Sequence, residues 1–549
     1  MRKQKRRKAM RTSDLLVTCL ENEGVEFVFG IPGEETLDIM DSLSRSKIRF
    51  ILTRHEQAAA FMADAYGRLR GKAGVCLSTL GPGATNLLTG IADAFLDRAP
   101  LVAITGQADL GRIHKESHQY INIVENFETA TKWNTRIQVP EMVPEVVRKA
   151  FKVAETERPG SVHIELPENI ACMEVGQVQS RTIPPIRARR SSPDRQSLRH
   201  AAELIEASSF PVILAGNGVV RKNASSQLKK FAELLDIPVV TTFMGKGAIT
   251  AKSGCYVGTL GLARDRQIAE VFPKADLIIA VGYDLVEYAA KLWNPNLDKK
   301  IIHIDFTTSE VDLHYVPEVE IVSDIRETLE LLEGMVSCNK KTEYTSTLHH
   351  ELFETFEKEG TVDSWPVHPQ RVIYAIRKIM GDDDIAVSDV GTNKLWMAKF
   401  YPVYGNNTLL ISNGFASMGF GLPAAIGAKL SYPDKKVLAV CGDGGFLMNV
   451  HELETARRLN LNVVVVIFED KGYNLIRWKS TRKFGNAFAV DFTNPDFVKL
   501  AESFGIEGMR IQSSDAVEEA LTSAFTKNGP VIIDVPIDYS DNEFLSGAL

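Results

Sequence analysis

The chain has 549 residues, 44% of them hydrophobic and 24% charged, which is an ordinary composition for globular domains. Its net charge is −7, and without the six basic residues among the first eight, MRKQKRRK, 57 basic residues stand against 70 acidic ones, a charge of −13. A body this acidic argues against a nucleic-acid-binding surface, and no stretch approaches the roughly 18 consecutive apolar residues that span a membrane.

The basic residues 1–9 are expected to be a tail before the folded chain, and Met10 could also begin the protein. They lack the apolar run of a secretory signal. Six cysteines lie far apart without a C-x-x-C pair: Cys19, Cys76, Cys172, Cys255, Cys338 and Cys441. In a chain this long they indicate buried thiols of a reduced, cytoplasmic protein rather than a disulfide framework or a zinc site.

Strand and helix patterns alternate along almost the whole chain. Residues 10–178 contain the strand patterns EFVFGIPG, IRFILT, AGVCLST and PLVAITGQ, with the helix patterns ETLDIMDSL, EQAAAFMADAYGRL and GATNLLTGIADAFL between them. The alternation returns in residues 192–336 and 365–541. Continuous apolar strands separated by helices are typical of parallel sheets covered on both faces. We therefore expect an α/β protein of three doubly wound domains with mainly parallel sheets, which agrees with roughly 100–200 residues per domain.

Two segments without hydrophobic periodicity separate these domains. Residues 179–191 are rich in proline, arginine and serine and are expected to be a linker. Residues 337–364 are polar and charged and are expected to be a second linker, part helix and part connector. Residues 542–549 are expected to be a tail.

The stretch VCGDGGFLM (440–448) places a carboxylate, Asp443, between glycines after an apolar strand. In open parallel sheets, ligands bind outside the carboxyl ends of the strands. The glycines let the backbone approach a ligand closely, and a helix starting near Phe446 would offer free N–H groups to a diphosphate. Beside it, Asp443 could hold a magnesium ion, which prefers oxygen ligands.

A second apolar strand, NVVVVIFEDKG (462–472), also ends in carboxylates. Asp470 could supply a second ligand to the same metal ion, and the carbonyl oxygen of Gly472 a third. The alternative is a turn aspartate and an unrelated charged strand end. The spacing favours the metal site, because 24 residues with helix and strand patterns separate Gly-Asp-Gly from Glu469-Asp470.

Glu56 opens a helix pattern whose next residues are mostly apolar, in LTRHEQAAAFMADAYGR (52–68). One interpretation is a first-turn acid that complements the helix dipole. The other is a catalytic carboxyl group, since an apolar setting favours the protonated form.

Together these stretches resemble the thiamine diphosphate enzymes, whose signature is Gly-Asp-Gly followed at this distance by Asn-Asn. Here Glu469-Asp470 stands in place of Asn-Asn. Arg-His-Glu-Gln around Glu56 is similar to the acetohydroxyacid synthase branch of that family. The resemblance implies that Glu56 activates the aminopyrimidine of the cofactor through N1′, and that Asp443, Asp470 and the Gly472 carbonyl bind Mg²⁺.

Further segments resemble the same branch, namely FGIPGEETLD (29–38), STLGPGATNLLTG (78–90), SDVGTNKLWM (388–397) and SNGFASMGFGLPAAIGA (412–428). The resemblance implies a pyrimidine pocket shaped by Pro32, Thr79, Pro82 and Asn86. It implies a diphosphate site at Val390, Gly391, Thr392 and Asn393. Gly444, Gly445 and Tyr473, beside the metal ligands, complete the expected cofactor-binding set.

Two more roles follow from the same resemblance. Met418 stands where the family has the hydrophobic wedge that bends the cofactor, and the Ala416 carbonyl would hold its 4′-amino group. Gln119, in SHQYIN (117–122), is the candidate for orienting the substrate. Read alone, a methionine before a glycine is usually a core residue, and a single loop glutamine means little.

The central domain lacks the Gly-Met-His-Gly and Arg-Phe-Asp-Asp-Arg signatures of the FAD-binding members. It has GTLGLARDRQ (258–267) and VGYDLVEYAAKLWN (281–294) instead, and is similar to the catabolic, FAD-independent type. FAD is therefore not expected. The chain also departs from that type at Gly33-Glu34-Glu35, where a Gly-Ala-Lys is common. The biosynthetic type has a tryptophan that shapes the acceptor pocket at the position of Lys479, whereas this chain has Trp478 one residue earlier.

The implied activity is a decarboxylating condensation of two pyruvates to 2-acetolactate and CO₂, dependent on thiamine diphosphate and Mg²⁺. The implied partners are small 2-oxoacid substrates and further copies of the chain. The first domain of one subunit would face the third domain of another, so that at least a homodimer, and a tetramer by the family pattern, is expected. Three alternatives stay open: another thiamine diphosphate-dependent decarboxylase or carboligase, a flavin-dependent pyruvate oxidase, and a non-catalytic paralogue.

Overall fold

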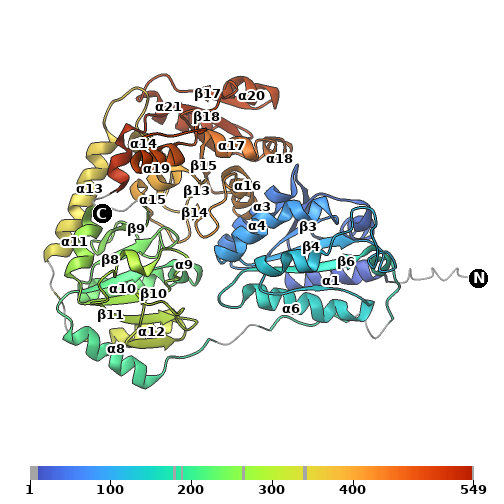
Figure 1. Ribbon diagram of the computed structural model, residues 1–549, viewed down its shortest axis with the longest axis horizontal. Coiled ribbons are helices and arrows are strands. Elements are labelled where there is room, and N and C mark those ends of the chain that lie inside the picture. The colour runs from blue at the N-terminus through green and yellow to red at the C-terminus, as the bar shows by residue number, and fades with distance from the viewer. Residues whose placement is uncertain are drawn as a thin grey trace, which may run out of the picture. The chain divides into compact units, whose positions relative to one another are not determined.

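The computed structural model describes residues 10–176, 181–186, 190–262, 266–337, 340 and 343–546. The predicted tail 1–9 lies outside the described residues, as do parts of the predicted linkers and of the tail 542–549. The chain forms two compact units, Met1–Ala188 and Arg189–Leu549, each described by itself (Figure 1). None of the helices in the described part of the chain has the length and hydrophobicity needed to cross a membrane.

The first unit is built on a six-stranded parallel sheet with the order β2-β1-β3-β4-β6-β5. Its strands are β1 (Phe27–Gly30), β2 (Arg49–Leu52), β3 (Gly74–Ser78), β4 (Leu101–Gln107), β5 (Asn134–Arg136) and β6 (Ser161–Pro167). Its helices are α1 (Thr12–Glu23), α2 (Leu37–Leu43), α3 (Glu56–Arg70), α4 (Pro82–Leu96), α5 (Ile123–Phe127), α6 (Val143–Glu155) and α7 (Glu168–Ala171), with short 3₁₀ turns at Glu34–Thr36, Glu128–Ala130 and Pro140–Met142.

Small side chains bring α3 and α4 close together over this sheet. Nearly every residue of α3 is buried, including a run of three alanines. Gly90 of α4 has no side chain, and a Cβ there would lie 2.5 Å from the Cβ of Ala60. The opposite face carries α1, α2 and α6, whose apolar residues share one core with the strands. This packing fixes the start of α3, where Glu56 lies.

The second unit contains two parallel sheets. The central one has the order β12-β11-β10-β7-β8-β9. It comprises β7 (Pro211–Ala215), β8 (Val239–Thr242), β9 (Tyr256–Leu260), β10 (Leu277–Val281), β11 (Lys300–Asp305) and β12 (Val319–Val322). Around it lie α8 (Arg195–Ala207), α9 (Asn217–Arg221), α10 (Ser225–Leu235), α11 (Arg266–Lys274), the 3₁₀ turn Ala290–Leu292 and α12 (Ile325–Glu333).

The third sheet has the order β14-β13-β15-β16-β18-β17. It comprises β13 (Ile385–Ser388), β14 (Leu409–Ile411), β15 (Val437–Gly442), β16 (Val463–Glu469), β17 (Glu507–Arg510) and β18 (Val531–Pro536). Its helices are α14 (Pro369–Ile379), α15 (Thr392–Phe400), α16 (Gly421–Ser431), α17 (Asp443–Met448), α18 (Glu452–Arg458), α19 (Asn474–Phe484), α20 (Phe497–Ser503) and α21 (Ala516–Ala524), followed by the 3₁₀ segment Ser540–Ser546. The prediction of three α/β domains with parallel sheets is confirmed.

The strand orders show where ligands can bind. Counted from the first strand of each domain, the first and third sheets share the order 2-1-3-4-6-5, and the central sheet has the order 6-5-4-1-2-3. Ligands of such sheets bind at the carboxyl ends of the strands where the order reverses. Those points lie between β1 and β3 in the first unit, between β7 and β10 in the central domain, and between β13 and β15 in the third domain.

The segment 337–364, expected to be part helix and part connector, contains an 18-residue helix, α13 (Glu343–Gly360), which packs against α14 and β9. Two other details differ from the sequence-based expectations. The helix expected near Phe446 begins at Asp443, because Gly442 is already its N-cap. Cys172 is exposed, whereas Cys19, Cys76, Cys255 and Cys441 are buried as expected; Cys338 lies outside the described residues.

Candidate active site

Glu56 is the first residue of α3 and is largely buried, with 8% of its surface exposed. The preceding residue, His55, is the N-cap, and its ring Nδ1 accepts a hydrogen bond from the Gln57 N–H at 3.1 Å. The Glu56 Oε2 accepts a hydrogen bond from the Asn86 side-chain amide at 3.0 Å. Glu56 is therefore a first-turn acid whose carboxyl group is largely buried, and its catalytic role stays a prediction.

The turn between β3 and α4 forms one wall beside Glu56. A Cβ at Gly83 would lie 3.3 Å from the Glu56 Oε1 and 2.9 Å from the Thr79 Cγ2, so only glycine leaves these two side chains their places. The Thr79 hydroxyl donates to the Glu35 Oε2 at 2.7 Å. Glu35 is a second buried carboxyl group at this edge, and no role for it was predicted from the sequence.

Gln119 reaches the same turn through its backbone. A Cβ at Gly81 would lie 2.4 Å from the Gln119 carbonyl oxygen, and Gln119 itself has a left-handed backbone with φ of 57°. Left-handed non-glycine residues are uncommon and cluster at functional sites. The structure thus brings Glu56, Thr79, Asn86 and Gln119 to one edge of the first sheet, where Pro32 and Pro82 are exposed.

The third domain presents a second group of predicted residues at its own reversal point. Val390 and Gly391 follow β13, and α15 begins at Thr392 with Gly391 as its N-cap at φ of 150°. The Asn393 side-chain amide donates to the Asp389 carbonyl oxygen at 2.8 Å. A nine-residue helix entered through a glycine offers unpaired N–H groups, which suits a diphosphate.

The segment after β14 carries the predicted wedge. Ala416 has a left-handed backbone with φ of 57°, and Met418 is half-buried between it and Gly419 at φ of 87°. The Gly419 N–H donates to both carboxylate oxygens of Asp389, at 3.0 and 3.2 Å. Met418 is thus held close to the end of β13.

Asp443 is buried at the end of β15 and gathers hydrogen-bond donors. Its carboxylate accepts from the backbone N–H groups of Gly444 at 2.8 Å, Asp470 at 3.1 Å and Lys471 at 2.7 Å. The Asn494 side-chain amide adds a bond of 2.8 Å. Asn494 was missed by the sequence analysis, because an amide 51 residues further along the chain gives no local signal.

Asp470 lies close enough to Asp443 for the charge of Asp443 to affect its pKa. Burial, and secondly the negative charge of Asp443, raise the pKa of Asp470 to about 7. The Arg477 Nη1 lies 3.3 Å from the Asp470 Oδ2, and its Nη2 2.5 Å from the Asp491 Oδ1. Two neighbouring carboxylates disfavour each other's ionised form, which a divalent cation between them would relieve.

This donor set fits magnesium. The described residues include no cluster of three or more His, Cys, Asp or Glu side chains that could hold a metal ion. Protein side chains would then supply two carboxylates, and backbone oxygen, water or phosphate the rest, which is the way Mg²⁺ is usually bound. Gly472, the third predicted ligand, forms an isolated bridge with Asp491 and packs under the Arg477 side chain.

A hollow of about 380 Å³ adjoins this loop. It is lined by Gly444, Leu447, Met448, Tyr473, Asp491, Phe492 and Thr493. The Tyr473 ring packs edge-on against the Phe492 ring with centroids 5.0 Å apart. A Cβ at Gly444 would lie 2.9 Å from the Tyr473 Cε1. Tyr473 therefore lies beside Gly444 and lines this hollow.

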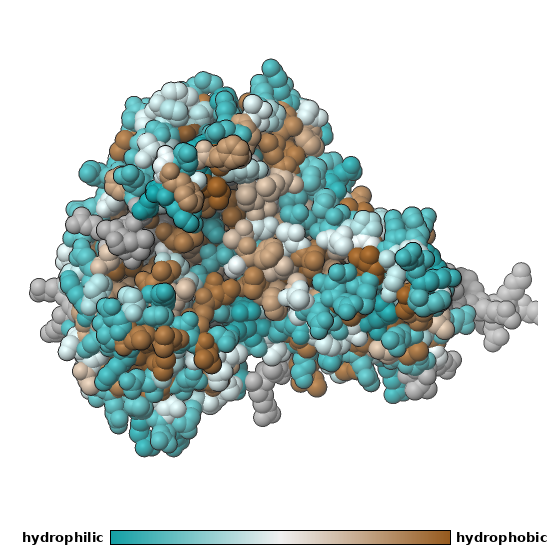
Figure 2. All heavy atoms as spheres, in the orientation of Figure 1, coloured by the Kyte–Doolittle hydropathy of each residue, from teal (hydrophilic) through white to brown (hydrophobic). Residues whose placement is uncertain are grey.

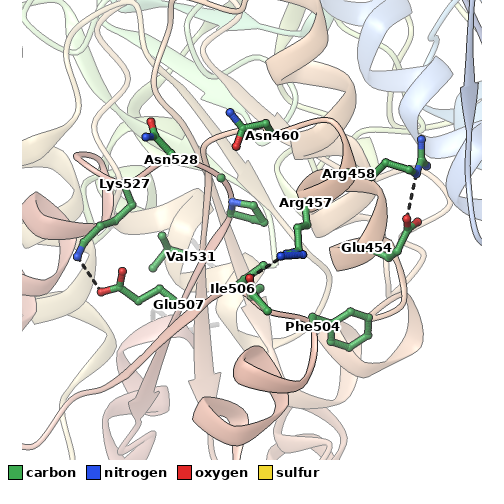
Figure 3. A pocket seen from close by; sticks show the side chains of 13 residues that line it. Glu454, Arg457, Arg458, Asn460, Phe504, Ile506, Glu507, Lys527, Asn528 and Val531 are labelled. Atoms are coloured by element: carbon green, nitrogen blue, oxygen red, sulfur yellow. Dashed lines mark hydrogen bonds and ion pairs between the residues drawn. The ribbon is translucent and has the colours of Figure 1, made fainter.

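A second hollow, of about 500 Å³, lies at the opposite edge of the same sheet, where β16, β17 and β18 begin (Figure 3). Its charged side chains are engaged within the protein: Lys527 pairs with Glu507 at 2.9 Å and Arg458 with Glu454 at 2.9 Å, and the Arg457 Nε donates to the Gly505 carbonyl oxygen at 2.8 Å (Figure 3). The amino ends of parallel strands do not form ligand sites in such folds. We assign the chemistry to the carboxyl edge.

Three sequence-family profiles match the chain and agree with this geometry. They are the N-terminal TPP binding domain of thiamine pyrophosphate enzymes over residues 10–126, the central domain over 198–332, and the C-terminal TPP binding domain over 389–535. Together they cover most of the chain. The three matches show that the chain belongs to the thiamine pyrophosphate enzyme family.

Within that family the chain is homologous to acetolactate synthases. It is 35% identical over 539 residues to "Acetolactate synthase" of Bacillus subtilis, covering 97% of this chain and 94% of that one. It is 36% identical to "Acetolactate synthase, catabolic" of Raoultella terrigena, with 98% and 97% covered. It is 32% identical to the large subunit of acetolactate synthase isozyme 1 of Escherichia coli, with 98% and 96% covered.

Proposed function

We propose that the protein is an acetolactate synthase that condenses two pyruvates to 2-acetolactate and CO₂, using thiamine diphosphate and Mg²⁺. The observation that carries this proposal is the pair of half-sites: buried Glu56 at one sheet edge, and Asp443 with Asp470 at the other. The full-length similarity to acetolactate synthases, including a catabolic one, supports this activity over the alternatives.

The bound cofactor would supply the carbon nucleophile and accept the electrons released by decarboxylation. Glu56 would hold a proton at the pyrimidine N1′, since its carboxyl group is buried and already oriented by Asn86. Asp443, Asp470 and the Gly472 carbonyl would hold the metal ion, and Val390–Asn393 the diphosphate. Met418 would fix the bend of the cofactor, and Gln119 would orient the substrate carbonyl.

A homodimer at least, and a tetramer by the family pattern, belongs to the same proposal. The two half-sites lie at the carboxyl edges of separate domains, and each edge is open. Exposed side chains there include Pro32, Leu37, Pro82 and Asn86 in the first unit, and Phe415, Met448 and Tyr473 in the third domain. Figure 2 shows apolar surface over the third domain on the face that it draws. Such open apolar edges are typical of surfaces that a partner covers.

We also propose that the central domain binds no FAD. Its turn between β7 and α9, Gly216-Asn217-Gly218, is the place where a dinucleotide phosphate would bind in a sheet of this order. There the Asn217 N–H donates to both carboxylate oxygens of Glu287, at 3.0 and 3.1 Å. The Glu287 carboxylate thus occupies the Asn217 N–H that would otherwise donate a hydrogen bond to a phosphate. A purified protein with flavin absorbance near 450 nm would contradict this part of the proposal.

Product analysis tests the activity. The protein, incubated with pyruvate, thiamine diphosphate and Mg²⁺, is expected to form acetolactate in amounts that account for the CO₂ released. Acetaldehyde as the main product would indicate a decarboxylase instead, and oxygen-dependent hydrogen peroxide would indicate a pyruvate oxidase. No pyruvate consumption would indicate a non-catalytic paralogue, although Glu56 and both metal carboxylates are present.

A further inference from the structure

Asp389 is a buried carboxylate in the stretch SDVGTNKLWM (388–397), and neither the sequence analysis nor the proposed chemistry gives it a role. It follows β13 directly and precedes Val390 of the diphosphate-binding turn. The solvent exposure of its side chain is 0%. Because a buried carboxylate is costly unless its oxygens are hydrogen-bonded, the donors around it show what it holds in place.

Those donors come from two segments far apart in the sequence. The Val390 N–H donates to the Oδ1 at 2.7 Å, and the Gly419 N–H donates to both oxygens at 3.0 and 3.2 Å. The backbone N–H groups of Phe420 and Gly421 also contribute. Asp389 therefore ties the turn after β13 to the loop that carries Met418.

A third segment packs against the same carboxylate. A Cβ at Gly445, in the metal-binding turn, would lie 2.7 Å from the Asp389 Oδ2. A Cβ at Gly421 would lie 2.9 Å from the Cβ of Asp389 and 2.6 Å from the Cys441 Sγ. Both glycines leave room for Asp389. Its side chain therefore contacts three segments: the diphosphate-binding turn, the Met418 loop and the metal-binding turn.

The donor pattern suits a carboxylate and no other side chain of this size. Both oxygens accept hydrogen bonds from N–H groups, and an asparagine would turn an NH₂ group toward one of those donors. Burial raises the pKa of Asp389 to about 7, against the backbone hydrogen bonds, which lower it. Hydrogen bonds to an ionised acceptor are shorter and stronger than neutral ones.

We propose that Asp389 is a positioning residue that holds the Met418 loop at a fixed place relative to the diphosphate-binding turn. This inference rests on the proposed cofactor-binding roles of Met418 and Val390–Asn393. The positioning role can be tested in the protein without cofactor, because the hydrogen bonds between Asp389 and the Met418 loop are formed by the chain itself.

The test replaces the carboxylate by its isosteric amide, Asp389→Asn, in the full-length protein. Amide hydrogen exchange of residues 419–421, measured by mass spectrometry without cofactor, is expected to become about tenfold faster or more, since each lost bond loosens that loop. With thiamine diphosphate and Mg²⁺, kcat is expected to fall about tenfold or more, while the KM for pyruvate changes less than about threefold.

Two variants serve as matched comparisons. Gly445→Ala introduces a Cβ 2.7 Å from the Asp389 Oδ2 and is expected to speed exchange at residues 419–421 in the same way. Ser388→Ala removes a neighbouring hydroxyl that donates to the Asp389 carbonyl oxygen at 3.1 Å, not to its carboxylate, and is expected to leave exchange and kcat near the wild-type values.

Unchanged exchange at residues 419–421 in Asp389→Asn would overturn the proposal, whatever the activity. So would equal loosening across all of the second unit, because that result indicates a general loss of stability. If the wild-type protein formed no acetolactate, the proposed activity would fail, but the exchange measurement would still decide the positioning role.

Discussion

Glu56 is held in a way that a surface glutamate is not. Its carboxyl group is buried at the start of α3, one oxygen accepts the Asn86 amide, and the other lies above Gly83. These contacts leave few orientations to the side chain. A preorganised carboxyl group of this kind is suited to hold a proton at one fixed atom of a ligand.

The variant Glu56→Gln tests that role. The amide keeps the size and the hydrogen-bonding capacity of the side chain but cannot exchange a proton, so kcat is expected to fall about a hundredfold or more with little change in thermal stability. Glu34→Gln is the matched control, because Glu34 is an exposed carboxylate in the same domain. Full turnover by Glu56→Gln would contradict the assignment.

Gly81 gives a second prediction at this scale. In Gly81→Ala, the new Cβ would lie 2.4 Å from the Gln119 carbonyl oxygen, at a backbone φ of 50°. The Gln119 segment has to move, so we expect the KM for pyruvate to rise about tenfold, measured by steady-state kinetics.

Gly71→Ala is the comparison for the effect of an alanine at a positive φ. Gly71 has a similar φ of 64°, but a Cβ there would meet nothing within 4 Å. Gly71→Ala is expected to lose about 1 kcal/mol of stability from its left-handed backbone. Gly81→Ala is expected to lose more, because Gly81 has a ψ of −113° and lies outside the left-handed region; only Gly81→Ala is expected to change the KM. Equal kinetics in the two variants would show that Gln119 does not act through this contact.

At the scale of elements, the first and third domains repeat one strand order. Each therefore presents its reversal point between its first and third strands, and each places a helix start there, α4 after β3 and α15 after β13. Two copies of one topology thus provide the two proposed half-sites: the buried acid Glu56 in one, and the proposed diphosphate-binding turn and metal ligands in the other.

Much of this could be predicted from the sequence. Buried parallel strands such as β4 and β16 are continuous apolar runs, which predict strands. Gly-Asp-Gly predicts the turn after β15. Short strands such as β14, three residues long, lack a readable pattern. The role of Asp389 could not be read either, because its donors at residues 419–421 come together only in the folded chain.

The buried histidine of β6 yields a prediction about pH. The His163 Nε2 lies 2.8 Å from the Thr105 Oγ1, and its ring packs 4.5 Å from that of Phe127. Burial, and secondly the positive charge of Arg136, lower the pKa of His163 from its ordinary value of 6.5 to about 3. Between these values the unfolded chain binds one proton more than the folded chain, so stability falls as the pH falls.

We expect this group to contribute a slope of about 1.4 kcal/mol per pH unit below pH 6.5. His163→Gln, which cannot take up a proton, should flatten the dependence of the urea midpoint on pH between roughly pH 6.5 and 4.5. His200→Gln is the control, because His200 is exposed on α8. An unchanged slope in His163→Gln would show that other groups determine the acid sensitivity.

At the scale of the whole molecule, the proposed active site forms only where the first domain of one copy meets the third domain of another. Glu56, the proposed activating acid, lies in the first unit, and Asp443 and Asp470, the proposed metal ligands, lie in the second. In the proposed dimer, each active site takes Glu56 from one subunit and Asp443 from its partner. The exposed prolines and Asn86 at the first edge, and Phe415 and Met448 in the third domain, would then be covered.

Complementation between two inactive variants tests this claim most directly. Glu56→Gln and Asp443→Asn are each expected to be inactive alone, and co-expression with separate affinity tags would yield mixed dimers. If the site is shared, each mixed dimer contains one doubly altered site and one intact site, so a statistical mixture should regain about a quarter of the wild-type activity. Mixed dimers that form but regain no activity would place both residues of a site in one chain and contradict the account.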